Sequence, residues 1–481
     1  MKERNDTDKF QSSGEIESAH EFEVMDGKFI MKKMIIARRI LLCAIFLLFV
    51  VFIVSHYDSK EYTVKNEQEY LNKICEMTGI PAMSVGIMDK DMEIYLNYSS
   101  DDNVIINEKS LYELASTTKA FTALGILQLE KNGKLNFTDS VDQYISWFSP
   151  EFEGRKATIT IGQLLEHTSG IPAWTICLIP SGTSENTNLI KTIEQIKNVK
   201  LKNEPGKVHE YATINYDILA LIIQEITGQK YEDYIQENVL EPIEMQNSFF
   251  RTDYFSDEIT QGNKVSFLQT KTYDAPVYYG NIAAGYLVSN TSDLMKWMKN
   301  VNELFNFDGF VVTNTTNYYA GWNVYDDYVS HSGNNPNYCS QVIIRRDNEL
   351  GVFVLSALSG SSATDVADNI YRMHSGEKIK IGLYIDNNVL LDFICIIAIL
   401  ILIYLMMLIQ INSKRKAVLS LIIGTTFILG VTLFSFLSHY NYCFLYVWCP
   451  ISFFVLLLTA IGIAIIQICN SVIWLKNKNA I

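Results

Sequence analysis

The sequence Leu114-Ala115-Ser116-Thr117-Thr118-Lys119-Ala120-Phe121-Thr122 begins a long apolar run that ends near Asn132-Gly133, which predicts a helix. Residues three positions apart lie on the same face of a helix, so the Lys119 amine can reach the Ser116 hydroxyl. The start of a helix also presents backbone N–H groups and a positive dipole, which favour negative charge on a nearby nucleophile. The stretch therefore predicts a serine nucleophile with a lysine beside it.

A serine hydroxyl needs a base to act as a nucleophile near neutral pH. The pKa of an ordinary lysine is ~10.4, so the pKa of Lys119 has to fall by about 3 units, or roughly 4 kcal/mol, for the amine to be neutral at pH 7. Burial or a second cation supplies shifts of that size. A Ser-x-x-Lys pair also arises by chance as a helix start with a solvated lysine, so the pair alone does not identify an active site.

Four further motifs follow the serine in a fixed order. They are Leu164-Leu165-Glu166-His167-Thr168-Ser169-Gly170-Ile171-Pro172, Glu204-Pro205-Gly206-Lys207-Val208-His209-Glu210-Tyr211-Ala212-Thr213-Ile214-Asn215-Tyr216, Ala283-Ala284-Gly285-Tyr286-Leu287-Val288-Ser289 with Asp293-Leu294, and His331-Ser332-Gly333. Together with Ser116 and Lys119, they resemble the β-lactamase-related serine hydrolases, which include class C β-lactamases, low-molecular-mass penicillin-binding proteins, D-aminopeptidases and related esterases. The resemblance covers roughly residues 70–375. It implies a β-lactamase/transpeptidase-like α+β fold, in which an antiparallel sheet is flanked by helices and joined to an all-helical subdomain.

The resemblance also implies catalytic roles. Ser116 would form the acyl-enzyme, and Lys119 would assist its deprotonation. Tyr211 matches the tyrosine of a Y-x-N motif and would pass the proton to the leaving group. The backbone N–H groups of Ser116 and Asn334 would form the oxyanion hole.

The motif His331-Ser332-Gly333 stands where relatives carry K-T-G or H-x-G on the strand that lines the site. By that match, His331 is expected to contact Tyr211 or the substrate. Ser332 and Gly333 are expected to bind the substrate.

Thr213 departs from the family pattern, because penicillin-recognising members carry Asn at this position of Y-x-N. A threonine hydroxyl is shorter than a carboxamide, so Thr213 is expected to contact substrate without supporting efficient β-lactam turnover. Asn215 lies two residues further on and is assigned to the following helix. His167 and Ser169 are interpreted as residues that shape a loop, and His209 as a surface or packing residue.

Two pairs of short apolar segments predict β-hairpins at the two ends of the domain. Ala82–Met88 and Met92–Tyr98 flank Asp89-Lys90-Asp91, while Ser340–Ile344 and Leu350–Leu358 flank Asp347-Asn348. Strands at both ends with helical sequence between them predict an antiparallel sheet and a helical insertion. The segment Thr364–Met373 places apolar residues on one face and predicts a closing helix.

The composition excludes several classes of partner. The chain has 481 residues, a formal charge of −14 and no basic stripe, which argues against nucleic-acid binding. Its eight cysteines include no C-x-x-C pair, so neither a zinc site nor a dense disulfide framework is expected. The expected partners are a small-molecule or peptide substrate and the lipid bilayer, with no metal and no cofactor.

Four apolar stretches are long enough to cross a bilayer as helices. They lie at Ile40–Val54 with Met34–Ile36 ahead of it, and near Phe393–Ile411, Ala417–Phe436 and Ile451–Ile473. Cytoplasmic flanks carry an excess of Lys and Arg. Such residues precede the first stretch, separate the second from the third and follow the last: Lys32, Lys33, Arg38, Arg39, Lys414, Arg415, Lys416, Lys476 and Lys478. All of them agree with a cytoplasmic N-terminus and a domain on the outer side.

These features predict four parts. Residues 1–31 are expected to be a disordered tail, 32–56 a membrane span or uncleaved signal anchor, 60–378 an extracytoplasmic serine hydrolase domain, and 389–476 three transmembrane helices. A cleaved signal peptide is the alternative for the first span, although Ser55-His56-Tyr57 offers no A-x-A cleavage site.

The predicted function is acyl transfer to water from a small amide or ester, such as a D-amino-acid peptide, at the outer membrane face. A domain of this type followed by three membrane helices also resembles colibactin-type prodrug-activating peptidases, which remove an N-acyl-D-asparagine cap. In those peptidases, the helical membrane part would bind an apolar tail of the substrate. The alternative is a catalytically weak receptor that binds a β-lactam or peptide and signals through the membrane helices.

Overall fold

A computed structural model describes residues 33–181, 188–251, 259–305, 315–409 and 411–479. The predicted tail, residues 1–31, lies outside them. The chain divides into two compact units: one comprises His56–Phe393 together with Val431–Phe454, and the other contains the remaining helical segments. The first unit carries every predicted site residue.

The centre of the first unit is a seven-stranded sheet with the strand order β11-β12-β13-β14-β15-β2-β3, in which every pairing is antiparallel. The strands are β2 (Ala82–Asp89), β3 (Met92–Ser99), β11 (Tyr318–Tyr319), β12 (Trp322–Val324), β13 (Tyr328–Asn334), β14 (Cys339–Arg345) and β15 (Leu350–Ser356). Strand β15 from the end of the domain pairs with β2 from its start. This pairing confirms the sheet built from both ends, and both predicted hairpins are present.

Helices pack onto the sheet where its residues are small or apolar. Helix α9 (Thr291–Phe305) packs on β2 at Gly86, where an added Cβ would lie 3.4 Å from the Thr291 Cβ. Helix α10 (Ser362–His374) packs on β14 and β15 through buried residues that include Val366 and Ile370. Helix α10 is the predicted closing helix.

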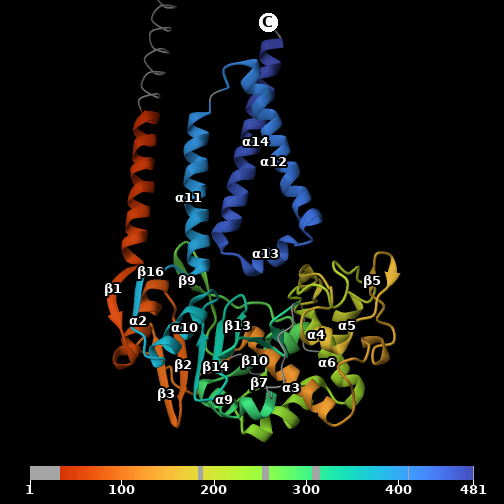
Figure 1. Cartoon of the computed structure of the whole chain (residues 1–481). Helices are drawn as coiled ribbons and strands as arrows, with labels where there is room; N and C mark the ends of the chain where they lie inside the picture. Colours follow the sequence, from red (N-terminus) through yellow and green to blue (C-terminus); the bar gives the residue numbers. More distant parts are fainter. Residues whose placement is uncertain (1–32, 182–187, 252–258, 306–314, 410, 480–481) are drawn as a thin grey trace, which may run out of the picture. The chain divides into compact units, whose positions relative to one another are not determined.

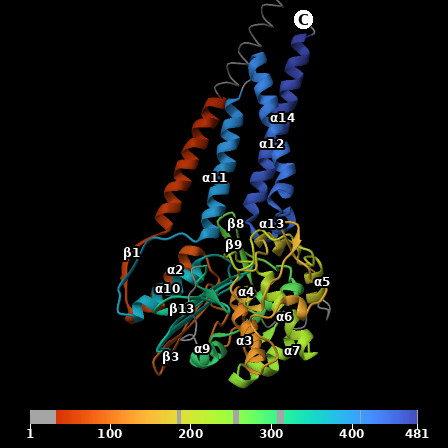
Figure 2. The same cartoon turned by 45° about the vertical axis from the view of Figure 1, so that its right-hand side comes forward.

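The helical subdomain lies beside the sheet in both views (Figures 1 and 2). Its elements include α3 (Thr118–Lys131), α4 (Ile161–Leu165), α5 (Asn188–Glu194), α6 (Ile214–Thr227) and α7 (Tyr231–Ile235). Helix α6 is the centre of this subdomain because ten consecutive residues, Ile214 to Ile223, are buried. Asn215 belongs to α6, as expected.

A two-stranded sheet joins the ends of the first unit and was not predicted. Strand β1 (Tyr57–Tyr62) pairs antiparallel with β16 (Ile379–Leu383). The β1 sequence, Tyr-Asp-Ser-Lys-Glu-Tyr, is polar and mostly exposed, so it lacks the apolar alternation that marks a half-buried strand.

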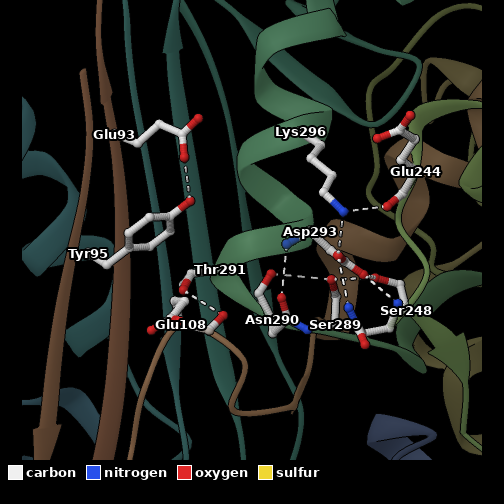
Figure 3. Close-up of polar contacts among 11 residues, drawn as sticks. Glu93, Tyr95, Glu108, Glu244, Ser248, Ser289, Asn290, Thr291, Asp293 and Lys296 are labelled. Carbon is white, nitrogen blue, oxygen red and sulfur yellow. Dashed lines mark hydrogen bonds and ion pairs between the residues drawn. The ribbon is translucent and has the colours of Figure 1, made fainter. Parts of the chain in front are cut away.

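Asp293 of the Asp293-Leu294 motif is a structural residue. Its buried carboxylate accepts hydrogen bonds from the Asn247 backbone N–H at 2.8 Å and the Ser248 hydroxyl at 3.0 Å, as Figure 3 shows for Ser248. The Asn290 carboxamide accepts the Asp293 backbone N–H at 2.9 Å and so satisfies a donor at the start of α9 (Figure 3). The motif thus fixes the start of α9.

Within the part of the chain that the structure describes, four helices are long and apolar enough to cross a membrane. They are Lys33–Ser55, α11 (Asn387–Leu408), α12 (Lys414–Ser438) and α14 (Ile451–Asn479). The second begins at Asn387, six residues before the predicted stretch, because polar residues continue the helix. A further short helix, α13 (Tyr442–Trp448), lies between α12 and α14 and was not predicted. Its aromatic sequence runs almost directly into the next apolar stretch, so periodicity does not separate the two.

Candidate active site

The predicted nucleophile lies in a strained turn rather than on the α-helix itself. Ser116 belongs to a 3₁₀ turn, Ala115–Thr117, and α3 begins at Thr118. Ala115 has a φ of 49°, in the left-handed region that residues with a Cβ rarely adopt. Such a strained conformation persists only where surrounding contacts stabilise it. Here the Leu114 carbonyl accepts hydrogen bonds from the Thr117 and Ser340 hydroxyls at 2.7 and 2.6 Å.

Lys119 is completely buried, and its Nζ lies 3.0 Å from the Ser116 Oγ. The amine also donates to the Ala284 carbonyl at 2.8 Å. Burial lowers the pKa of Lys119 to about 7, and the buried Asp217 carboxyl only partly opposes this. The rings of Tyr211 and Tyr216 lie 5.1 and 5.9 Å from Nζ and favour the charged amine, but desolvation is the larger effect. A substantial fraction of Lys119 is therefore neutral at pH 7.

The Tyr211 phenol lies near Ser116. Burial of the hydroxyl end raises the pKa of Tyr211 above its ordinary value and outweighs the interaction with Ser116, which acts to lower this pKa, so the phenol is protonated at neutral pH. The residue as a whole is nevertheless 36% exposed. Ser116 is thus in contact with a partly neutral amine and a neutral phenol, which can respectively remove and deliver a proton.

His167 lies directly against Tyr211, a contact that the sequence motif did not reveal. The two ring centroids are 4.2 Å apart. The His167 Nδ1 lies 2.9 Å from the Asn215 Nδ2 and 3.4 Å from the Ala212 backbone N, and burial holds its pKa well below the ordinary value. The neutral ring therefore accepts hydrogen bonds and supports the segment that carries Tyr211. Ser169 donates to the Asn215 Oδ1 at 2.9 Å in the same loop.

His331 hydrogen-bonds to Tyr318, a residue that the sequence did not single out. Its Nε2 lies 2.9 Å from the Tyr318 hydroxyl, while its ring centroid is 6.3 Å from that of Tyr211. The side chain is buried, and this burial lowers the pKa of His331 to about 3. Tyr318 comes from β11, and no motif distinguished it from the other tyrosines of the chain.

Gly333 is the point at which β13 meets the nucleophile turn. An added Cβ would lie 2.3 Å from the Leu114 carbonyl oxygen and 3.0 Å from the Ser116 backbone N. Only glycine permits this approach. Its neighbours Ser332 and Asn334 are exposed, and the Asn334 Oδ1 accepts the Gly360 N–H at 3.2 Å. The geometry explains why the motif ends in glycine.

A small cavity of about 40 Å³, partly open to solvent, lies beside the nucleophile. Its lining includes the predicted residues Ser116, Thr213 and Asn334. It also includes Asn281, which the sequence analysis missed. The Asn281 Oδ1 is buried and has no hydrogen-bond partner among the described residues. Asn281 ends a short 3₁₀ turn, Tyr279–Asn281, directly before α8 (Ile282–Gly285), and no motif in the sequence singled it out.

Within the described ranges, no group of three or more His, Cys, Asp and Glu side chains is arranged to hold a metal ion.

The antiparallel sheet, the helical subdomain and the contact between Ser116 and the buried Lys119 define a protein of the β-lactamase/transpeptidase-like class. Solved structures share this fold. The octameric penicillin-binding protein homologue from Pyrococcus abyssi is 22% identical with a TM-score of 0.57, and the match covers 65% of this chain and 78% of that chain. A D-stereospecific amidohydrolase from Streptomyces sp. is 16% identical with a TM-score of 0.53, and the match covers 63% and 98%.

The Beta-lactamase family model matches residues 65–377, and the chain therefore belongs to this family of serine hydrolases. A curated relative, Protein flp from Staphylococcus aureus (strain NCTC 8325), is 30% identical over 431 residues, which cover 79% of this chain and 85% of the relative.

Proposed function

We propose that this chain is a membrane-anchored serine hydrolase that forms an acyl-enzyme on Ser116 and hydrolyses a small amide or ester, such as a D-amino-acid peptide. The observation that carries the proposal is the 3.0 Å contact between Oγ of Ser116 and Nζ of the fully buried Lys119. The fold of the D-stereospecific amidohydrolase supports the substrate class.

In the proposed reaction, neutral Lys119 takes the proton from Ser116 while Oγ attacks the substrate carbonyl carbon. The backbone N–H groups of Ser116 and Asn334 receive the negative charge that develops on the carbonyl oxygen. Tyr211 donates its proton to the leaving nitrogen or oxygen and recovers a proton from Lys119. Water then attacks the acyl-enzyme, and the same groups act in reverse order to release the acid.

The proposal also places the hydrolase domain outside the cytoplasm. The support is the position of basic residues at the ends of the four candidate spans, notably Arg38 and Arg39 in the first helix and Lys414–Lys416 at the start of α12.

The full chain in detergent, treated with a fluorophosphonate probe that reacts with activated serines, tests the proposal. We expect one labelled site per chain, assigned to Ser116 by peptide mass spectrometry, and no labelling of Ser116→Ala. Equal labelling of the two proteins would exclude Ser116 as the nucleophile. Ser169→Ala, which removes a buried loop hydroxyl, is a control expected to retain labelling at Ser116.

Asn281 supports an amide as the substrate. Thr213 cannot supply a carboxamide, but the Asn281 carboxamide stands on the wall of the same cavity. It offers one acceptor and two donors, which match the N–H and C=O of a substrate amide. Its buried oxygen, which accepts no hydrogen bond from any residue that the structure describes, costs free energy until such a ligand arrives.

We therefore expect Asn281→Ala to lower kcat/KM for an N-acetyl-D-alanine p-nitrophenyl ester by about 10- to 100-fold, the usual range when a buried hydrogen bond to substrate is lost. The propanoyl p-nitrophenyl ester lacks the amide and should change less than threefold. Asn300→Ala, on α9 and outside the cavity, should change neither value. Equal losses for the two esters would contradict amide recognition by Asn281.

A further inference from the structure

The connection between two candidate membrane spans belongs to the catalytic unit. Residues Val431–Phe454 form one compact unit with His56–Phe393, although they join α12 to α14. Within this connection, α13 places Phe444 and Trp448 in the lining of the cavity that contains Ser116. The two side chains are four residues apart, lie on one face of the helix and stack with ring centroids 5.5 Å apart.

Lys264 holds α13 in this position. Its amine donates to the backbone carbonyls of Tyr446 and Val447, both at 2.8 Å, and the residue is 95% buried. The last carbonyls of a helix lack intrahelical partners, and the Lys264 amine satisfies two of them, while its burial lowers the pKa of Lys264 to about 8. The Lys264 side chain belongs to β8 (Asn263–Ser266), in a part of the fold far from α13 in sequence.

Other contacts fix both ends of the connection. The Asn441 carboxamide donates to the Cys177 carbonyl at 3.4 Å, and the ring of His439 stacks on Trp174 at 4.7 Å. After α13, the buried Ser452 hydroxyl donates to the Asp392 carboxylate, which also accepts the Phe267 N–H at 3.2 Å. The aromatic wall is therefore built into the unit by polar contacts on each side.

The cavity has two chemically different parts. Ser116 and Asn281 contribute the polar groups that react with or recognise a carbonyl compound. Ile176, Ile179, Phe444 and Trp448 contribute apolar surface beside them. A flexible saturated chain attached to the reacting carbonyl is the group that such a wall would remove from water.

We propose that Phe444 and Trp448 are specificity residues that bind an apolar acyl chain of the substrate. The inference rests on the proposed function, because it requires acylation of Ser116. The occupant is an alkyl chain on the acyl side of an ester or amide. A molecule of this kind partitions into lipid, and the flanking helices α12 and α14 are themselves apolar enough to enter a bilayer.

The test measures kcat/KM of the full chain in detergent micelles for p-nitrophenyl decanoate and p-nitrophenyl butyrate. Wild-type protein should prefer the decanoate. Phe444→Ala and Trp448→Ala should each lower the decanoate-to-butyrate ratio of kcat/KM about 10-fold, which is the effect of losing about two methylene contacts. The two variants are measured separately, so that misfolding of one leaves the other informative. Partitioning of the long ester into micelles affects all variants equally and cancels in this comparison.

Tyr446→Ala is the matched control, because Tyr446 is an aromatic residue of α13 that is 55% exposed and does not line the cavity. It should keep the wild-type ratio. Folded Phe444→Ala and Trp448→Ala proteins with the wild-type ratio would overturn the inference. Failure of the proposed function is distinct: Ser116→Ala would then hydrolyse the butyrate as fast as wild type.

Discussion

Lys119→Met is expected to slow acylation of Ser116 by about 10³- to 10⁴-fold, the upper part of the range for loss of a positioned general base. Methionine keeps the length and apolar stem of lysine but cannot accept the Ser116 proton across the 3.0 Å contact. The measurement is the rate of the p-nitrophenol burst with p-nitrophenyl butyrate. Lys131→Met, at the exposed end of the same helix, is the control and should retain the wild-type rate.

The pH dependence follows from the same side chain. Acylation requires neutral Lys119, whose pKa is lowered to about 7, so the rate should rise with pH through about 7 and then level off. Below that point it should fall about tenfold per pH unit. The raised pKa of Tyr211 predicts no loss from its ionisation below pH 10. A rate independent of pH between 5 and 8 would contradict Lys119 as the base.

Lys119→Met should raise the free energy of unfolding at pH 7 although it lowers activity. The pKa of Lys119 is depressed in the folded chain, so unfolded chains bind more protons between pH 7 and 10.5, and wild-type stability rises with pH across that window. Lys119→Met removes the destabilisation that comes from burying this amine, which is about 4 kcal/mol at pH 7. The variant should therefore melt at a higher temperature while losing activity, which excludes unfolding as the cause of the loss.

Local sequence patterns predicted the parts of the fold that depend on local interactions. The hairpin around Asp89-Lys90-Asp91 joins two strands that are adjacent in the chain, and the i, i+3 spacing already places Lys119 beside Ser116. The sheet between both ends followed from the order of strands and helices. These interactions need no knowledge of which distant segments meet.

The missing parts of the candidate site depend on contacts between segments far apart in the chain. His331 meets Tyr318 because β11 and β13 belong to one sheet, and many tyrosines fit the pattern equally well. Asn281 reaches the cavity from a 3₁₀ turn that carries no motif. Trp448 stands among apolar residues in the sequence, and no motif there marks it as part of a site. Its place beside Ser116 follows only from the packing of α13 on the catalytic unit.

Tyr211→Phe is expected to lower kcat/KM for a D-alanine anilide by about 10³-fold, because the amine leaving group has to be protonated as it departs. The p-nitrophenyl ester of the same acyl group should lose about tenfold less, since its leaving group departs without a proton. Phenylalanine keeps the ring that packs on His167 at 4.2 Å, so folding stability should change by less than about 1 kcal/mol. Tyr325→Phe, an exposed aromatic outside the site, should behave as wild type. Equal losses for anilide and ester would show that the Tyr211 hydroxyl orients Ser116 rather than delivering a proton, and unchanged values for both would remove Tyr211 from the mechanism.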